Sequence, residues 1–182
     1  MEPLSPDERS GPASCVRLGA VSQPVAIRAA GRADHAVVLR FHRDLYIRHR
    51  DELARPDVIP LLAYRDLDGT LRDDVEGLLS GRDTRVLLAE REGHAVGYIT
   101  GHVEVDPRRV LTRKGVVEDW FVARDERGQG TGRLLLDTLL EGFRRDGCQV
   151  AESGTWAFND GARKAHAKAG FTEIEVKFRK RL

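Results

Sequence analysis

Apolar residues in the first half of the chain recur at the spacing of two amphipathic helices. One stripe follows Asp34, a residue type that often caps a helix N-terminus, and consists of Val38, Phe41 and Leu45. The second stripe consists of Leu71, Val75, Leu78 and Leu79. Pro56 and Pro60 interrupt the periodicity between the two stripes, so residues 50–69 are expected to form a loop or a broken helix.

Shorter apolar runs along the rest of the chain have the character of strands. They cover residues 24–28, 85–90, 95–105, 115–123 and 150–153, and a last one begins at Phe171. Residues 91–94 are typical of a hairpin turn, and helices are expected over residues 131–146 and 160–169. This order predicts one α/β domain in which a mixed, mostly antiparallel sheet is flanked by helices.

Composition narrows the possible partners. The chain has 182 residues, which suits one domain, and its formal net charge of +1 provides no global field for nucleic acid or an anionic membrane. No apolar run approaches the roughly 20 residues that span a bilayer. Cys15 and Cys148 lie far apart, so we expect no metal site and a cytoplasmic protein. Residues 1–22 are expected to be a flexible leader, and residues 23–182 the folded domain.

A glycine-rich turn at residues 127–133, Arg-Gly-Gln-Gly-Thr-Gly-Arg, lies between a predicted strand and a predicted helix. Glycines let a backbone turn tightly and approach a ligand, and a helix N-terminus presents free N–H groups, so the turn predicts a phosphate site. Arg127 and Arg133 add cationic donors at its rim. The turn lacks the Lys-Ser/Thr pair of a P-loop, and its G-x-G-x-G spacing differs from that of a dinucleotide fingerprint.

The turn resembles the R/Q-x-x-G-x-G/A motif of the Gcn5-related N-acetyltransferase (GNAT) family, with Arg127, Gly130 and Gly132 at the marked positions. Residues 117–122 resemble the strand that precedes this motif, and residues 159–171 resemble the N-x-x-A…Y-x-x-x-G-F segment that follows it. The resemblance implies an N-acetyltransferase that uses acetyl-CoA as its donor. The residues it implies for donor binding are Phe121, Val122, Ala123, Arg127, Gly128, Gln129, Gly130, Thr131, Gly132, Arg133, Asn159 and Arg163.

Acetyl transfer to an amine requires that the acceptor lose a proton, because a model lysine pKa is near 10.4. Glu118 and Asp119 are the candidate bases, since they lie on the strand that would run beside the thioester. Neighbouring strand residues point to opposite faces, so only one of the two is expected to enter the site. Resemblance to diamine acetyltransferases of the family favours Glu118. His102 and Glu104 share one face of the preceding strand and are candidates to line the acceptor pocket.

His166 stands where many members of the family have a tyrosine that is thought to protonate the leaving thiolate. A histidine can donate such a proton, because its unperturbed pKa is near 6.5, or it can simply fill space. Both interpretations remain open. We therefore count His166 with Glu118 and Asp119 as candidate catalytic residues.

The resemblance implies a small-molecule or protein amine as the acceptor. Aminoglycoside 6'-N-acetyltransferases often carry histidine at the position of His166, followed by G-F-x-E, as in residues 170–173, and by a basic, aromatic last strand, as in residues 176–180. Aminoglycosides or polyamines are therefore candidate substrates. The acidic helix face formed by Asp73, Asp74 and Glu76 either attracts such a polycation or is merely solvated. The alternative function is a non-catalytic acyl-CoA-binding sensor module. Resemblance to dimeric relatives also makes a homodimer possible.

Overall fold

The computed structural model describes residues 23–81 and 83–182. The predicted flexible leader, residues 1–22, lies outside the described residues. The helices are η1 (Arg32–Asp34), α1 (His35–Ile47), η2 (Arg48–Leu53), α2 (Ile59–Leu62), α3 (Leu67–Ser80), η3 (Arg124–Glu126), α4 (Thr131–Arg145) and α5 (Asp160–Lys168). The strands are β1 (Ala26–Ala29), β2 (Thr84–Arg91), β3 (His94–Val105), β4 (Arg113–Val122) and β5 (Val150–Ser153).

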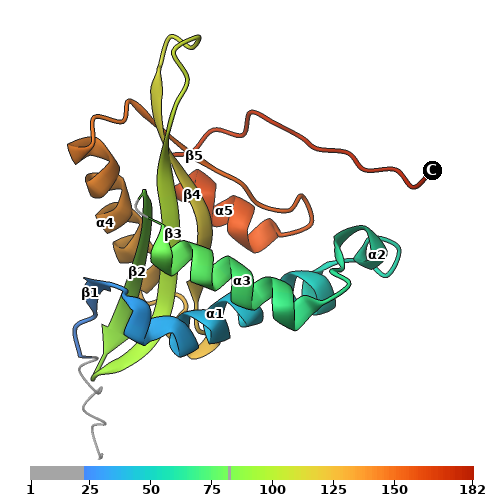
Figure 1. Cartoon of the computed structure of the whole chain (residues 1–182), viewed down its shortest axis with the longest axis horizontal. Helices are drawn as coiled ribbons and strands as arrows, with labels where there is room; N and C mark the ends of the chain where they lie inside the picture. The colour runs from blue at the N-terminus through green and yellow to red at the C-terminus, as the bar shows by residue number, and fades with distance from the viewer. Residues whose placement is uncertain (1–22, 82) are drawn as a thin grey trace, which may run out of the picture.

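The strands of the described residues form one five-stranded sheet in chain order, β1-β2-β3-β4-β5. Neighbouring strands pair antiparallel except for β4 and β5, which are parallel. Helices α1 and α3 cover one face of the sheet and α4 the other (Figure 1). This confirms the predicted α/β fold with a mixed, mostly antiparallel sheet. None of the helices in the described part of the chain has the length and apolarity of a membrane span.

Each face of the sheet has its own apolar core. The core under α1 and α3 consists of Val38, Phe41, Val75, Val86, Leu88, Tyr98 and Phe121. The core under α4 consists of Ala89, Val96, Ile99, Val117, Leu135, Leu136, Leu139 and Phe143. Burying each of these larger side chains contributes about 1.5–3 kcal/mol. Both predicted helical stripes supply core residues, which confirms that they are the inward faces of α1 and α3.

Two local expectations are refined by the structure. The stretch between α1 and α3 is a broken helix, since it consists of η2 and the short α2 with non-helical residues between them. Helix α3 begins at Leu67, inside the predicted range. Asp34 precedes α1, but its carboxylate does not cap that helix. The carboxylate instead pairs with Arg28 at 2.8 Å and accepts a hydrogen bond from the Gly31 amide.

The strand predicted from Phe171 onward is not formed. Residues 171–182, all within the described part of the chain, contain no strand and run away from the sheet (Figure 1). An alternating sequence becomes a strand only where a sheet edge accepts its hydrogen bonds, and this segment is held elsewhere. Glu173 pairs with Arg163 of α5, and Arg179 donates to the Leu61 carbonyl. The apolar face of the segment therefore stays in solvent, with Ile174 82% exposed.

Candidate functional site

A β-bulge in the centre of the sheet places both candidate bases on one face. Ile99 pairs with Trp120 and Gly101 with Val117, so Glu118 and Asp119 together lie opposite the single residue Thr100. The expectation that only one of the two carboxylates would face the site is therefore wrong, because strict alternation fails at a bulge. Both side chains lie on the sheet face that α1 and α3 cover, as the contacts below demonstrate.

Asp119 is held from several elements in a half-buried cluster. Its Oδ2 lies 3.0 Å from Nδ1 of His42, which α1 contributes, and its backbone amide donates to Thr100 Oγ1 at 3.1 Å. The Tyr98 hydroxyl lies 3.1 Å from the same His42 nitrogen. On the other side of the ring, His42 Nε2 lies 3.5 Å from Asp74 Oδ2 of α3. The cluster thus joins α1, α3 and two central strands around one carboxylate.

The charges of this cluster shift two pKa values. Burial opposes the protonated form of His42, but the hydrogen bonds and charges of Asp119 and Asp74 outweigh it and raise the His42 pKa. Burial, together with the charge of Asp119, raises the pKa of Tyr98 well above its ordinary value. Tyr98 is therefore a hydrogen-bond donor throughout the neutral range, and His42 carries its proton to higher pH than a free imidazole does.

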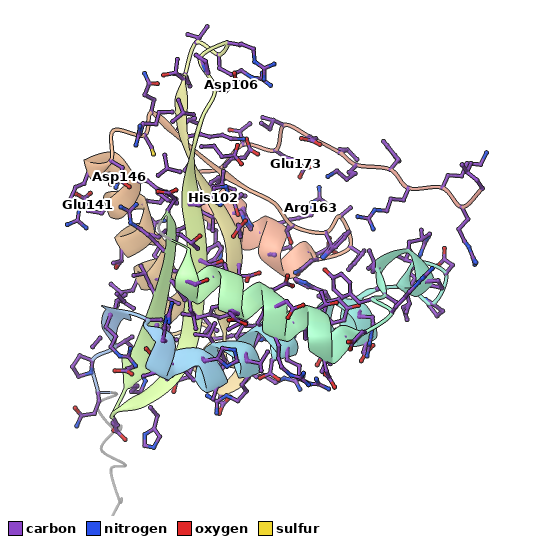
Figure 2. All side chains as sticks on the ribbon, in the orientation of Figure 1. His102, Asp106, Glu141, Asp146, Arg163 and Glu173 are labelled. Carbon is purple, nitrogen blue, oxygen red and sulfur yellow. The ribbon has the colours of Figure 1, made fainter. Side chains whose placement is uncertain are left out.

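Glu118 lies in a second, more open cluster on the same face. Its Oε1 is 3.4 Å from His102 Nδ1, and the other ring nitrogen of His102 is 3.1 Å from Glu104 Oε1. His102 lies on β3 (Figure 2). Hydrogen bonds from His102 and Lys114 lower the pKa of Glu104. The structure thus brings His102 and Glu104 beside Glu118.

The glycine-rich turn adopts a backbone that requires glycine at two positions. Gly128 and Gly130 have φ values of +79° and +87°, and a Cβ built on either would meet no described atom within 4 Å. Gly130 is the N-cap of α4, so the first N–H groups of that helix face this open space. Thr131 Oγ1 is buried and has no partner among the described residues. This geometry fits an anionic group seated on the turn.

Side-chain hydrogen bonds and ion pairs stabilise the glycine-rich turn. Arg91, at the end of β2, lies 3.0 Å from Glu126 Oε2 and donates to Gln129 Oε1 at 3.2 Å. Gln129 in turn donates to the Asp125 carbonyl. Arg133 pairs with Asp137 one helical turn farther along α4. Sequence reasoning missed Arg91, because its partners lie 35 and 38 residues away on another element.

A cavity of about 300 Å³ adjoins the turn, between α1, η2 and the end of β4. It is lined by Asp44, Ile47, Arg48, Glu52, Phe121, Ala123, Arg124, Asp125 and Arg127. Three of the residues predicted to bind the acetyl donor, Phe121, Ala123 and Arg127, therefore line this cavity. Arg127 folds back over the Phe121 ring and donates from Nε to the Val122 carbonyl at 2.8 Å. The Val122 carbonyl is therefore already a hydrogen-bond acceptor in this structure.

His166 and Asn159 have structural partners on both sides. His166 Nδ1 lies 2.7 Å from the Ala162 carbonyl and donates to it, and Nε2 lies 2.8 Å from the Ser153 hydroxyl. The ring also packs edge-on against Trp120 and Phe171. The buried Asn159 caps α5 by accepting from the Ala162 amide and donates to His49 Nε2.

Arg163, the last of the residues predicted to bind the acetyl donor, pairs with a residue outside the turn. Its guanidinium donates to Glu173 at 2.9 Å, and both side chains lie between α5 and the C-terminal segment (Figure 2). The structure therefore gathers residues 121–133 at one end of β4 and places Asn159 and Arg163 on α5.

Comparisons with known proteins agree with this geometry. The profile of the acetyltransferase (GNAT) family matches residues 46–171, more than half of the chain. An aminoglycoside N(6')-acetyltransferase type 1 of Klebsiella aerogenes is 33% identical over 117 residues, which cover 59% of this chain and 76% of the relative. The aminoglycoside N-acetyltransferase AAC(6')-Iy, solved in complex with CoA, superimposes with a TM-score of 0.67 at 20% identity, over 87% of this chain and 96% of that one. A tetramutant of the BH1408 protein of Bacillus halodurans superimposes with a TM-score of 0.73 at 22% identity, over 86% of this chain and 99% of that one.

Proposed function

Because the chain belongs to the acetyltransferase (GNAT) family and is an N-acetyltransferase with acetyl-CoA as its donor, we propose that it acetylates a polycationic small-molecule amine, with aminoglycosides as the leading class. The observation that carries this proposal is the bulge, which turns Glu118 and Asp119 to the same face of the sheet. Asp74 of α3 adds a third carboxylate there. Several carboxylates around one reaction centre favour an acceptor that bears several ammonium groups.

The acceptor class has support from a relative as well. The Klebsiella aerogenes protein is named as an aminoglycoside N(6')-acetyltransferase, and this chain covers 76% of its length. An aminoglycoside carries several ammonium groups on a rigid ring system, which matches a surface with spaced carboxylates better than a single amine does. The acidic face of α3 contributes to this surface through Asp74, which points toward His42.

The donor side follows from the glycine-rich turn. We assign the CoA pyrophosphate to the N–H groups of the turn and of the first turn of α4, where the helix dipole favours negative charge. Phe121 and Val122 end β4 and Ala123 follows it, and in our proposal pantetheine pairs with this stretch through the Val122 backbone, since the Ala123 amide already donates to the Val96 carbonyl. Arg127 then leaves the Val122 carbonyl as pantetheine arrives. Asn159 and Arg163 act indirectly in this proposal, since each has a protein partner.

The chemistry requires one proton acceptor near the thioester. In our proposal Asp119 takes a proton from the acceptor ammonium, and the freed lone pair attacks the thioester carbonyl. The C–S bond then breaks, and the proton that the nitrogen sheds neutralises the CoA thiolate. Glu118 remains the alternative base or holds a second ammonium group. Because both nitrogens of His166 are engaged, its contacts support a packing role, with a thiolate that leaves without an enzyme acid.

A CoA-release screen tests the proposal. Purified protein and acetyl-CoA are mixed with aminoglycosides, polyamines, amino acids and lysine peptides. We expect release with aminoglycosides, a loss of at least about 100-fold for Asp119→Asn, and a smaller loss for Glu118→Gln. A larger loss for Glu118→Gln would make Glu118 the base. Tight acetyl-CoA binding without release for any amine would instead support a non-catalytic sensor module.

A further inference from the structure

His42 occupies a position on α1 that a purely apolar helix face would give to a leucine. Val38, Phe41 and Leu45 surround it at helical spacing, and Val38 and Phe41 are buried core residues. The His42 side chain is only 15% exposed. An imidazole placed there loses most of its hydration, so its hydrogen bonds must compensate for it.

The partners of His42 are two carboxylates and a phenol. Nδ1 faces Asp119 and Tyr98, and Nε2 faces Asp74. Nδ1 can carry only one hydrogen, which goes to the stronger acceptor, the Asp119 carboxylate. The Tyr98 hydroxyl lies 3.1 Å from the same nitrogen, and the charge of Asp119 helps to raise the Tyr98 pKa, so β3 contributes to this cluster beside α1. Among the described residues, Asp119, Tyr98 and Asp74 are the titratable groups that contact His42 from the elements packed against it.

Glu118 provides an internal comparison. It is the neighbouring residue on the same bulge, but its side chain is 43% exposed and its contact is with His102 on the surface. Asp119 is 18% exposed and is held by His42, whose Nδ1 also lies beside the hydroxyl of the buried Tyr98. One carboxylate of the pair is therefore held in place and the other is free to adjust.

We propose that His42 is a positioning residue for Asp119, and that the hydrogen bond from its Nδ1 holds this carboxylate aimed at the acceptor amine. This inference rests on the proposed function, in which Asp119 takes the acceptor proton. His42 itself need not touch either substrate. Its effect on acetyl transfer passes through Asp119, and Asp74 on its other nitrogen ties the same ring to the acceptor-binding face.

The pairing can be tested without any substrate by following the His42 ring through a pH titration by NMR. Removal of the negative charge in Asp119→Asn destabilises the imidazolium, so the His42 pKa should fall by about one unit or more. Glu118→Gln is the matched control and should leave the His42 pKa unchanged. A His42 pKa that is the same in wild type and Asp119→Asn would overturn the proposal.

The catalytic role is tested by a double-mutant cycle. His42→Gln should lower kcat by about tenfold or more and leave KM for acetyl-CoA unchanged, whereas His35→Gln on the same helix should have no effect. In the Asp119→Asn background, His42→Gln should cause no further loss, because its effect passes through the missing carboxylate. Equal losses in both backgrounds would mean a merely structural role and would overturn the proposal.

The same cycle separates the two proposals. Full turnover in His42→Gln, together with a large loss in Asp119→Asn, would overturn the role of His42 and leave the proposed function intact. Full turnover in Asp119→Asn would overturn the assignment of Asp119 as base, and with it the catalytic role of His42. The NMR titration then still decides whether the two side chains are paired.

Discussion

The backbone amide of Asp119 donates a hydrogen bond to Thr100 Oγ1 at 3.1 Å, across the bulge between β3 and β4. Thr100 is fully buried, so its hydroxyl replaces the ladder carbonyl that the bulge takes away from this amide. One side chain of β3 thereby stabilises the local geometry that turns Glu118 and Asp119 to the same face. The candidate site depends on this irregularity of the sheet.

Thr100→Val should therefore destabilise the fold and displace Asp119. An unsatisfied buried amide costs about 1–3 kcal/mol, and valine keeps the shape of threonine without its hydroxyl. We expect the free energy of unfolding in urea to fall by about that amount and kcat to fall with it. Thr100→Ser retains the hydroxyl and should keep kcat near wild type. Equal kcat in Thr100→Val and wild type would contradict a role for this hydrogen bond in the site.

Gly130→Glu should abolish acetyl-CoA binding in calorimetry, because the side chain would fill the open space before α4 and repel phosphate. Gly147→Glu is the matched control, since Gly147 also has a positive φ, +76°, and open space around it, but lies beyond the other end of α4. Both variants should lose a similar stability of about 1–2 kcal/mol from backbone strain. Unchanged acetyl-CoA affinity in Gly130→Glu would defeat the assignment of the pyrophosphate.

Asp74→Asn should raise KM for a polycationic acceptor by about two- to fivefold, the range of one exposed ion pair, and leave KM for acetyl-CoA unchanged. The neighbouring Asp73→Asn is the control, because Asp73 lies on the solvent face of α3 and has no contact with the His42 cluster in the described structure. The difference between the two variants should shrink as salt is added. Equal KM values for the acceptor in Asp74→Asn and Asp73→Asn at low salt would exclude a role for Asp74 of α3 in acceptor binding.

The stability of the N-terminal part of the domain should depend on pH because of the ionisation of Asp34. Hydrogen bonds from Arg28 and from the Gly31 amide lower the Asp34 pKa to about 2. Because the folded-state pKa lies below the unfolded value, this contribution is present above about pH 4 and is lost as pH falls toward 2. Asp34→Asn should thus be less stable than wild type at pH 6, and the gap should close in acid. A gap that stays constant from pH 6 to pH 2 would contradict the shifted pKa.

Local patterns predicted the parts of this protein that depend on neighbouring residues. The glycine spacing before α4 identified a turn that needs positive φ at Gly128 and Gly130, and the apolar stripe of Val38 and Phe41 identified the inner face of α1. His42 stands at i+4 from Val38, so the same stripe already contained the signal that this imidazole faces inward.

Long-range pairing accounts for what the sequence did not predict. The bulge arises from the register between β3 and β4, and the contact of His42 with Asp119 joins residues 77 positions apart. Alternation over residues 171–178 is typical of a strand, but a strand also needs a partner at a sheet edge, and this segment is held elsewhere by the Arg163–Glu173 ion pair and by the hydrogen bond from Arg179 to the Leu61 carbonyl. Such features depend on which distant segments meet, and no local pattern encodes that.

The most direct test compares CoA release with one aminoglycoside and with the same compound after its amino groups have been chemically acetylated. We expect acetyl-CoA-dependent release and a product heavier by one acetyl group with the free amine, and only background release with the blocked compound. Background release with both forms, from protein that binds acetyl-CoA, would contradict the proposed acceptor.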